Sequence, residues 1–179
     1  MYKNIIFDRD GIINEIVERD GVISSPWSMG EFRFLEASKA FLKKISSFGK
    51  LLFIATNQPD IARGNLKIST LKKMHQIISK EYKILEIFFC PHDNSDDCNC
   101  RKPSPGMLCE IIKKYKLVEK ETLMIGDSFK DIEAASAANI DSVFYLTSYN
   151  KHHLSVISKN KNCTVVKSFS EIEYLINFD

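Results

Sequence analysis

Short apolar stretches alternate with amphipathic ones along the chain, and polar clusters follow several of the apolar stretches. The apolar stretches predict buried strands at residues 3–7, 51–55, 85–89, 122–125, 142–146 and 164–166. Apolar residues at helical spacing predict helices at 37–48, 66–79, 105–115, 129–138, 152–157 and 171–176. Strands that alternate with helices favour parallel pairing. We therefore expect an α/β fold, a three-layer sandwich around a central, mainly parallel, doubly wound sheet.

Length and charge limit the kind of protein. The 179 residues, 44% of them hydrophobic, predict one domain that spans residues 1–179. A net charge of +2 gives no reason to expect a nucleic acid or an anionic membrane as partner. No apolar run approaches the roughly 18 residues of a spanning helix, and the first strand begins too early for a signal peptide. We expect a cytoplasmic monomer.

The cysteines cluster around a histidine. Five cysteines are an odd number, and a secreted disulfide framework would usually spread an even number along the chain. Three thiolates and an imidazole are a common ligand set for structural Zn²⁺. We predict a zinc-stapled loop over residues 90–102, with four ligands, Cys90, His92, Cys98 and Cys100. The alternative is a buried histidine with three free thiols, and we expect Cys109 and Cys163 to be core thiols.

Two acidic clusters follow predicted strands. Asp8 and Asp10 come after the strand at 3–7, and Asp127 and Asp131 come after the strand at 122–125. Ligands of parallel sheets bind at the carboxyl ends of the strands, where these clusters would meet. Converging carboxylates need a positive charge between them, and Mg²⁺ prefers oxygen ligands. The alternative is that these residues cap helices and turns. Two clusters at strand ends together favour a magnesium site.

Four motifs resemble those of the haloacid dehalogenase-like phosphohydrolases. In chain order they are Phe7-Asp8-Arg9-Asp10-Gly11, Thr56-Asn57-Gln58, Arg101-Lys102-Pro103 and Gly126-Asp127-x-x-x-Asp131. One motif alone would be weak, but four in order, each after a predicted strand, are specific. The match covers residues 3–146, most of the chain. The resemblance implies a magnesium-dependent phosphatase, and a chain of this length leaves no room for a separate cap domain.

The resemblance also implies a role for each motif residue. Asp8 is the expected nucleophile, which forms an aspartyl-phosphate, and Asp10 the expected general acid and base. Thr56 and Lys102 are expected to stabilise the phosphoryl oxygens. The implied magnesium ligands are the carboxylates of Asp8 and Asp127 and the backbone carbonyl of Asp10, with Asp131 in the outer shell. Without the other motifs, Thr56 would be read as a strand-end residue and Lys102 as a solvated charge.

The cysteine loop and its flanks resemble two branches of this family, the heptose bisphosphate phosphatases and the histidinol-phosphate phosphatases. Residues 57–64 and 101–108 favour the heptose branch. That branch implies four substrate-binding residues, Asn57, Gln58, Arg63 and Arg101, with the arginines on the far phosphate or the sugar. We expect hydrolysis of D-glycero-D-manno-heptose 1,7-bisphosphate to heptose 1-phosphate, a reaction that supplies surface polysaccharide. The alternatives are histidinol phosphate and another small phosphomonoester.

The sequence departs from the heptose pattern in three places. Pro59-Asp60 replaces the more usual Ser-Gly, and Ser128 stands where a lysine often follows the last motif aspartate. Residues 22–32, where a substrate-facing loop is expected, contain an unmatched Ser-Ser-Pro-Trp. The loss of the lysine removes a positive group, which leaves a different sugar phosphate open.

A binding module for protein or RNA, with decayed aspartate motifs, is the alternative from another class. Two observations argue against a binding module: every motif position is intact, and the net charge is near neutral. His152 and His153 are expected in a solvated loop or at a helix start.

Overall fold

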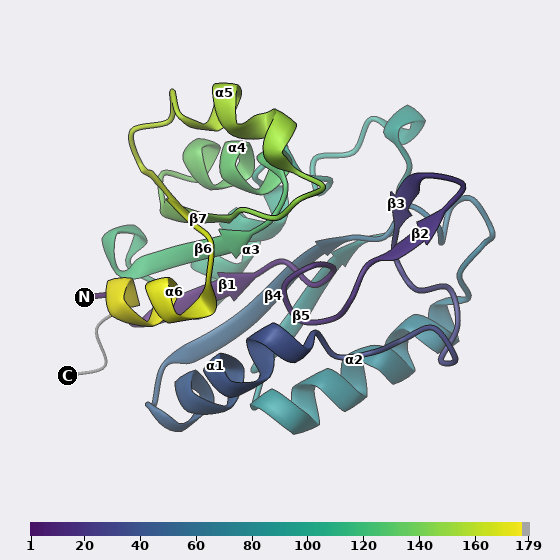
Figure 1. Cartoon of the computed structure of the whole chain (residues 1–179), viewed down its shortest axis with the longest axis horizontal. Coiled ribbons are helices and arrows are strands. Elements are labelled where there is room, and N and C mark those ends of the chain that lie inside the picture. Colours follow the sequence, from purple (N-terminus) through teal and green to yellow (C-terminus); the bar gives the residue numbers. More distant parts are fainter. Residues whose placement is uncertain (177–179) are drawn as a thin grey trace.

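A six-stranded sheet forms the centre of the computed structural model, which describes residues 1–176 (Figure 1). Its strands, in spatial order, are β5 Glu86–Cys90, β4 Leu51–Asn57, β1 Asn4–Phe7, β6 Thr122–Gly126, β7 Asp141–Tyr145 and β8 Cys163–Val166. Every neighbouring pair is parallel, which confirms the predicted parallel α/β sheet. The chain runs outward from β1 first through β4 and β5 and then through β6, β7 and β8. The switch point therefore lies beside β1.

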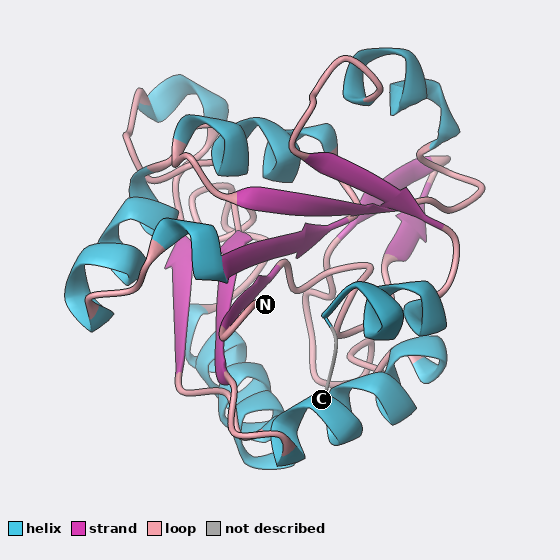
Figure 2. Cartoon of the chain, turned by 90° about the vertical axis from the view of Figure 1, so that its left-hand side faces the viewer, coloured by secondary structure: helices cyan, strands magenta, loops and turns pink. Residues whose placement is uncertain are grey.

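Helices cover both faces of the sheet, as Figures 1 and 2 show. They are α1 Glu36–Ser47, α2 Ile68–Tyr82, α3 Gly106–Tyr115, α4 Phe129–Ala137, α5 Leu154–Ile157 and α6 Phe169–Ile176, with the 3₁₀ turns η1 Asn94–Asp96, η2 Glu119–Glu121 and η3 Lys151–His153. One core joins α1, α2 and α6 to side chains such as Ile5 and Phe7, and the other joins α3 and α4 to Ile6. All of β1 is buried, because alternate side chains enter opposite cores.

An antiparallel hairpin forms a small second sheet outside the central one. It pairs β2 Val17–Arg19 with β3 Val22–Ser24 through a two-residue turn. Asp20 and Gly21 have φ angles of 50° and 77°, which a type I′ turn requires at both positions. A loop was expected at residues 22–32, and β3 forms its first three residues; Asp-Gly between apolar residues is a hairpin signal that this prediction overlooked. In the described residues, no separate cap domain interrupts the α/β core.

The expectation that Cys109 is a core thiol is wrong, because its side chain is exposed. The buried face of α3 carries Met107, Leu108 and Ile111, and the helical period turns position 109 toward solvent. Cys163, near the tail, is half-buried. None of the helices within residues 1–176 is long and apolar enough to span a bilayer.

Candidate active site

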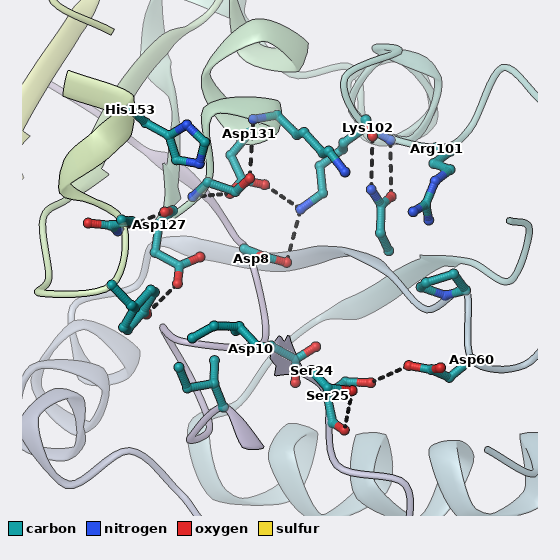
Figure 3. A pocket seen from close by; sticks show the side chains of 18 of the residues that line it. Asp8, Asp10, Ser24, Ser25, Asp60, Arg101, Lys102, Asp127, Asp131 and His153 are labelled. Carbon is teal, nitrogen blue, oxygen red and sulfur yellow. Dashed lines mark hydrogen bonds and ion pairs between the residues drawn. The ribbon is translucent and has the colours of Figure 1, made fainter. Parts of the chain in front are cut away.

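Three carboxylates meet at the carboxyl end of the sheet, beside the switch point. Asp8 follows β1, and its backbone N–H donates to the carbonyl oxygen of Ile125 on β6 at 2.8 Å. This bond extends the ladder between β1 and β6, so that Asp8 and Asp127 follow neighbouring strands. One carboxylate oxygen from each of Asp8, Asp127 and Asp131 lies within 4.8 Å of the others. The two acidic clusters of the sequence therefore form one site (Figure 3).

Lys102 lies between two of these carboxylates and is only 2% exposed. Its Nζ donates to Asp8 Oδ1 at 2.9 Å, to Asp131 Oδ1 at 2.5 Å and to the carbonyl oxygen of Ala55 at 2.7 Å. The three protons of the ammonium group thus have three acceptors. The Asn57 side chain holds the backbone of Lys102 through bonds of 2.9 and 3.0 Å to its carbonyl and N–H. Asn57 is therefore placed to position Lys102.

The acidic site carries more negative charge than Lys102 neutralises. Burial raises the pKa of Asp8 to about 7; the Lys102 charge opposes this rise, and the carboxylates of Asp131 and Asp10 add to it. Burial, with Asp8 and Asp131, also raises the pKa of Asp127 well above its usual range. Each cause acts by disfavouring the ionised carboxyl group. An all-oxygen donor set with excess negative charge fits Mg²⁺.

Asp10 faces a separate set of hydrogen-bond donors. Its carboxylate accepts from Arg9 Nη2 at 2.8 and 3.0 Å, from Asn14 Nδ2 at 2.8 Å and from Gln58 Nε2 at 2.9 Å. Gln58 Nε2 also donates to Thr56 Oγ1 at 2.9 Å. The Arg9 side chain is fully buried, which sequence reasoning missed because the motif alone does not show where this side chain points. These contacts hold Asp10 in an orientation different from that of Asp8.

The C-terminal segment supports Asp127. Tyr149 Oη donates to Asp127 Oδ2 at 2.5 Å. Asn150 Nδ2 donates to the carbonyl oxygens of Asp127 at 2.8 Å and Tyr145 at 2.9 Å. Gly11 packs tightly here, since a Cβ at this position would lie 2.1 Å from Asp127 Oδ2. Sequence reasoning missed Tyr149 and Asn150, and no local pattern marks them.

Asp131 and Ser128 form a capping box at the start of α4. The Ser128 N–H donates to Asp131 Oδ2 at 3.0 Å, and the Lys130 N–H donates to Ser128 Oγ at 3.3 Å. Both carboxylate oxygens of Asp131 are thus engaged, one by Lys102 and one by the helix terminus. This arrangement sets the direction of the first turn of α4 relative to the acidic site.

A cavity of about 370 Å³ opens in front of the carboxylates. Strand β3 contributes Ile23 and Ser24 to its wall, Ser25 follows directly, and η3 contributes His152 and His153. The two histidines thus lie at a helix start, as expected, but they also face the cavity. Ser25 Oγ donates to Asp60 Oδ2 at 3.3 Å. Two of the departures from the heptose pattern therefore contact each other at the cavity wall (Figure 3).

Arg63 and Arg101 both line the cavity. Arg63 makes a two-pronged ion pair with Asp93, at 2.6 and 2.7 Å, which raises the pKa of the guanidinium group. Arg101 instead donates to neutral acceptors, Asn94 Oδ1 at 2.8 Å and the carbonyl oxygen of His92 at 3.2 Å. Within residues 1–176, Arg101 therefore makes no ion pair at contact distance, although its charge acts on Asp93, which Arg63 already engages.

The four predicted zinc ligands lie together, Cys90 at the end of β5 and the other three in the loop that follows. The three cysteine Sγ atoms are 3.2, 3.5 and 3.6 Å apart, and His92 Nδ1 lies 3.5 Å from Cys90 Sγ and 3.3 Å from Cys100 Sγ. Tetrahedral Zn²⁺ with Zn–S bonds of about 2.3 Å separates thiolates by about 3.8 Å. The donor set and its spacing fit zinc. The cluster immediately precedes Arg101 and Lys102, so it can fix both cations.

The chain is similar to known proteins in sequence and in fold. The HAD-hydrolase-like family matches residues 99–172. The D-glycero-beta-D-manno-heptose-1,7-bisphosphate 7-phosphatase of Neisseria meningitidis is 35% identical over 158 residues, 86% of this chain and 82% of that protein. The D-glycero-alpha-D-manno-heptose-1,7-bisphosphate 7-phosphatase of Campylobacter jejuni is 30% identical over 98% of this chain and 95% of its own. The crystal structure of the B. bronchiseptica D,D-heptose 1,7-bisphosphate phosphatase, complexed with magnesium and phosphate, superposes with a TM-score of 0.85 at 27% identity, over 97% of each chain.

Proposed function

Because this chain belongs to the D-glycero-D-manno-heptose-1,7-bisphosphate 7-phosphatase family of haloacid dehalogenase-like hydrolases, we propose that it removes the 7-phosphate of this bisphosphate. It is a phosphoric monoester hydrolase that uses Mg²⁺. The observation that carries the proposal is the Asp8–Lys102 pair beside Asp127 and Asp131, in a chain similar over most of its length to these phosphatases. The product would be heptose 1-phosphate.

Asp8 is the proposed nucleophile. Lys102 contacts Oδ1, and within residues 1–176 no hydrogen bond reaches Oδ2, which leaves that oxygen for attack. A bond forms between Oδ2 and phosphorus while the bond from phosphorus to the sugar oxygen breaks, which yields an aspartyl-phosphate. Water then attacks this phosphorus, and inorganic phosphate leaves Asp8. Lys102 stabilises the charge on Asp8 and on the phosphoryl oxygens through both steps.

Asp10 is the proposed general acid and base. It gives its proton to the departing sugar oxygen and later takes one from the attacking water. Its bonds to Arg9, Asn14 and Gln58 hold the carboxyl group in place for both transfers. Thr56, buried at the end of β4, is proposed to donate to a phosphoryl oxygen. Asn57 and Gln58, first expected to touch substrate, support Lys102 and Asp10 through the bonds described above.

The proposed magnesium ligands are the carboxylates of Asp8 and Asp127 and the backbone carbonyl of Asp10. Both oxygens of Asp131 already accept hydrogen bonds, which supports an outer-shell role for it. When bound, Mg²⁺ neutralises the charge that otherwise keeps a carboxylate and a phosphate apart. We also propose that Cys90 and its three partner ligands bind structural zinc, which would hold the loop that carries Lys102.

Phosphate release from both anomers of heptose 1,7-bisphosphate and from histidinol phosphate tests the proposal. We expect rapid release from one heptose anomer and little from histidinol phosphate. Asp8→Asn should lower the rate at least about 1,000-fold, because the amide cannot act as nucleophile. Asp20→Asn makes the same chemical change in the exposed hairpin turn and should leave the rate unchanged. Equal or faster release from histidinol phosphate would overturn the substrate, and a fully active Asp8→Asn would overturn the mechanism.

A further inference from the structure

Lys130 is a cation at the cavity to which none of the site motifs assigns a role. It lies in the first turn of α4, three residues after Asp127, and its half-buried side chain lines the cavity together with Arg101. Within residues 1–176 no carboxylate lies at ion-pair distance from its Nζ. The neighbouring Asp131 cannot serve as a strong partner, because Lys102 and the Ser128 N–H already engage its two oxygens.

The positive groups at this end of the cavity act on one another. Burial lowers the pKa of Lys130; Arg101, Lys102 and Arg63 lower it further, and the Asp131 carboxylate opposes them. Lys130 in turn adds to the lowering of the pKa of His153, which burial and His152 cause first. The side chains of Lys130, Arg101 and His153 therefore lie close together at this end of the cavity. In the described part of the chain, neither Lys130 nor Arg101 makes a close ion pair with a carboxylate, and neighbouring cations in such an arrangement favour the entry of an anion.

Ser128 and Lys130 together explain the departure from the heptose pattern. Ser128 stands where similar phosphatases often carry a lysine, and its hydroxyl accepts from the Lys130 N–H as the cap of α4. A lysine at position 128 could not form this cap. A lysine two residues later, still in the first turn of α4, keeps a cation at the same cavity. Ser128 thus caps α4, and Lys130 supplies the positive charge at the cavity.

We propose that Lys130, together with Arg101, binds the phosphate group of the substrate that is not hydrolysed. The ligand class is a sugar that carries a second phosphate, and the inference rests on the proposed function. His153 would form the wall beyond this subsite, because its ring packs against Phe129 with centroids 4.8 Å apart. Lys130 would contribute to the preference for a bisphosphate over a monophosphate of the same sugar, and it would take no part in bond cleavage.

The test compares heptose 1,7-bisphosphate with heptose 7-phosphate, which lacks only the far phosphate. The measured quantity is the ratio of kcat/KM for the bisphosphate to kcat/KM for the monophosphate. A hydrogen bond between charged groups corresponds to a factor of about 10–150, so Lys130→Met should lower the ratio about tenfold or more. Lys130→Arg keeps the charge and should retain most of the ratio. Lys120→Met, the same change at an exposed lysine on η2, should match the unaltered protein.

The outcomes distinguish a wrong role for Lys130 from a wrong proposed function. A Lys130→Met ratio within about twofold of the unaltered protein would overturn the role of Lys130, whereas failure of the unaltered protein to hydrolyse either heptose phosphate would overturn the proposed function. In that second case, the same ratio measured with fructose 1,6-bisphosphate and fructose 6-phosphate decides on Lys130. A ratio that does not depend on Lys130 with this pair overturns the inference. Melting temperatures of all variants show whether each is folded.

Discussion

Magnesium should stabilise this protein more at pH 8 than at pH 5. Without metal, burial raises the pKa of Asp8 from 3.8 to about 7. A carboxyl group whose pKa is raised by folding adds stability below its unfolded pKa, and this contribution is lost as the pH rises through the folded pKa. A bound Mg²⁺ ion favours the ionised carboxylate and so removes the penalty at high pH. At low pH, the metal must first displace the proton.

The pKa of Asp8 sets the size of the effect. Between pH 5 and the folded pKa of about 7, the proton on Asp8 opposes metal binding by about two pH units, which correspond to about 3 kcal/mol. At saturating magnesium, the stabilisation of the folded state should therefore be larger at pH 8 by about 3 kcal/mol. For a chain of this length, this difference corresponds to about 6–12 °C in Tm. Asp127, with its pKa raised in the same direction, would increase the effect.

The assay is thermal unfolding with and without saturating MgCl₂ at several values between about pH 5 and pH 8. Magnesium should be removed by desalting and not by chelation, because a chelator would also remove zinc from the proposed cysteine site. The difference between the two Tm values at each pH is the measured quantity. The Tm without subtraction would not isolate the effect of Asp8, because His75 also titrates. Burial lowers the pKa of His75 to about 3, so total stability rises with pH below about 6.5. Its contribution cancels in the difference.

Asp8→Asn provides the control, because it removes the titrating carboxyl group. In this variant, the magnesium-dependent increase in Tm should be smaller and should depend less on pH. An increase in the unaltered protein that stays flat or falls between pH 5 and pH 8 would refute the reasoning. It would mean that the carboxylates are already ionised without metal.

Three further predictions concern the surroundings of Asp8. Lys102→Met should lower kcat about 100-fold or more, because it removes the cation beside the nucleophile; phosphate release with the proposed substrate measures this, and an unchanged kcat would contradict it. Cys100→Ser should lower the zinc content and the Tm, as metal analysis and thermal unfolding would show, whereas Cys109→Ser at the exposed thiol should change neither. Asn150→Leu should lower the free energy of unfolding by about 2–4 kcal/mol and weaken magnesium binding, since it leaves the carbonyls of both Asp127 and Tyr145 without their donor; denaturant unfolding and magnesium titration test this, and unaltered values would show that the bonds are dispensable.

The order and type of the main elements could be predicted from local pattern. The run at 122–125 and the amphipathic stretch at 129–138 are found as β6 and α4 with shifts of one residue. Strand alternation with helices was sufficient for parallel pairing, and parallel pairing brings the strand ends to one edge. The sequence alone therefore predicts that Asp8 and Asp127 lie close together. The cysteine cluster was equally accessible, because its four ligands lie within eleven consecutive positions.

Contacts between segments that are distant in the sequence could not be predicted from local pattern. The motif indicated no position for the Arg9 side chain, and the structure buries this side chain fully against Asp10. The predicted substrate contacts at Asn57 and Gln58 could not be separated from the support that these amides give to Lys102 and Asp10, because both roles use the same polar atoms. Cys109 was misjudged, since its exposure depends on which face of α3 packs on the sheet.

The local sequence therefore specifies the elements and the residues that stand at their ends, because hydrophobic period and strand order act over short distances along the chain. The position of Lys130 at the cavity and the bonds from Tyr149 and Asn150 to Asp127 arise only when α4 and the C-terminal segment pack beside β6. These contacts join residues about twenty positions apart or more, and no periodic signal records them. Packing of the whole chain, and not local pattern, brings these three residues to the acidic site.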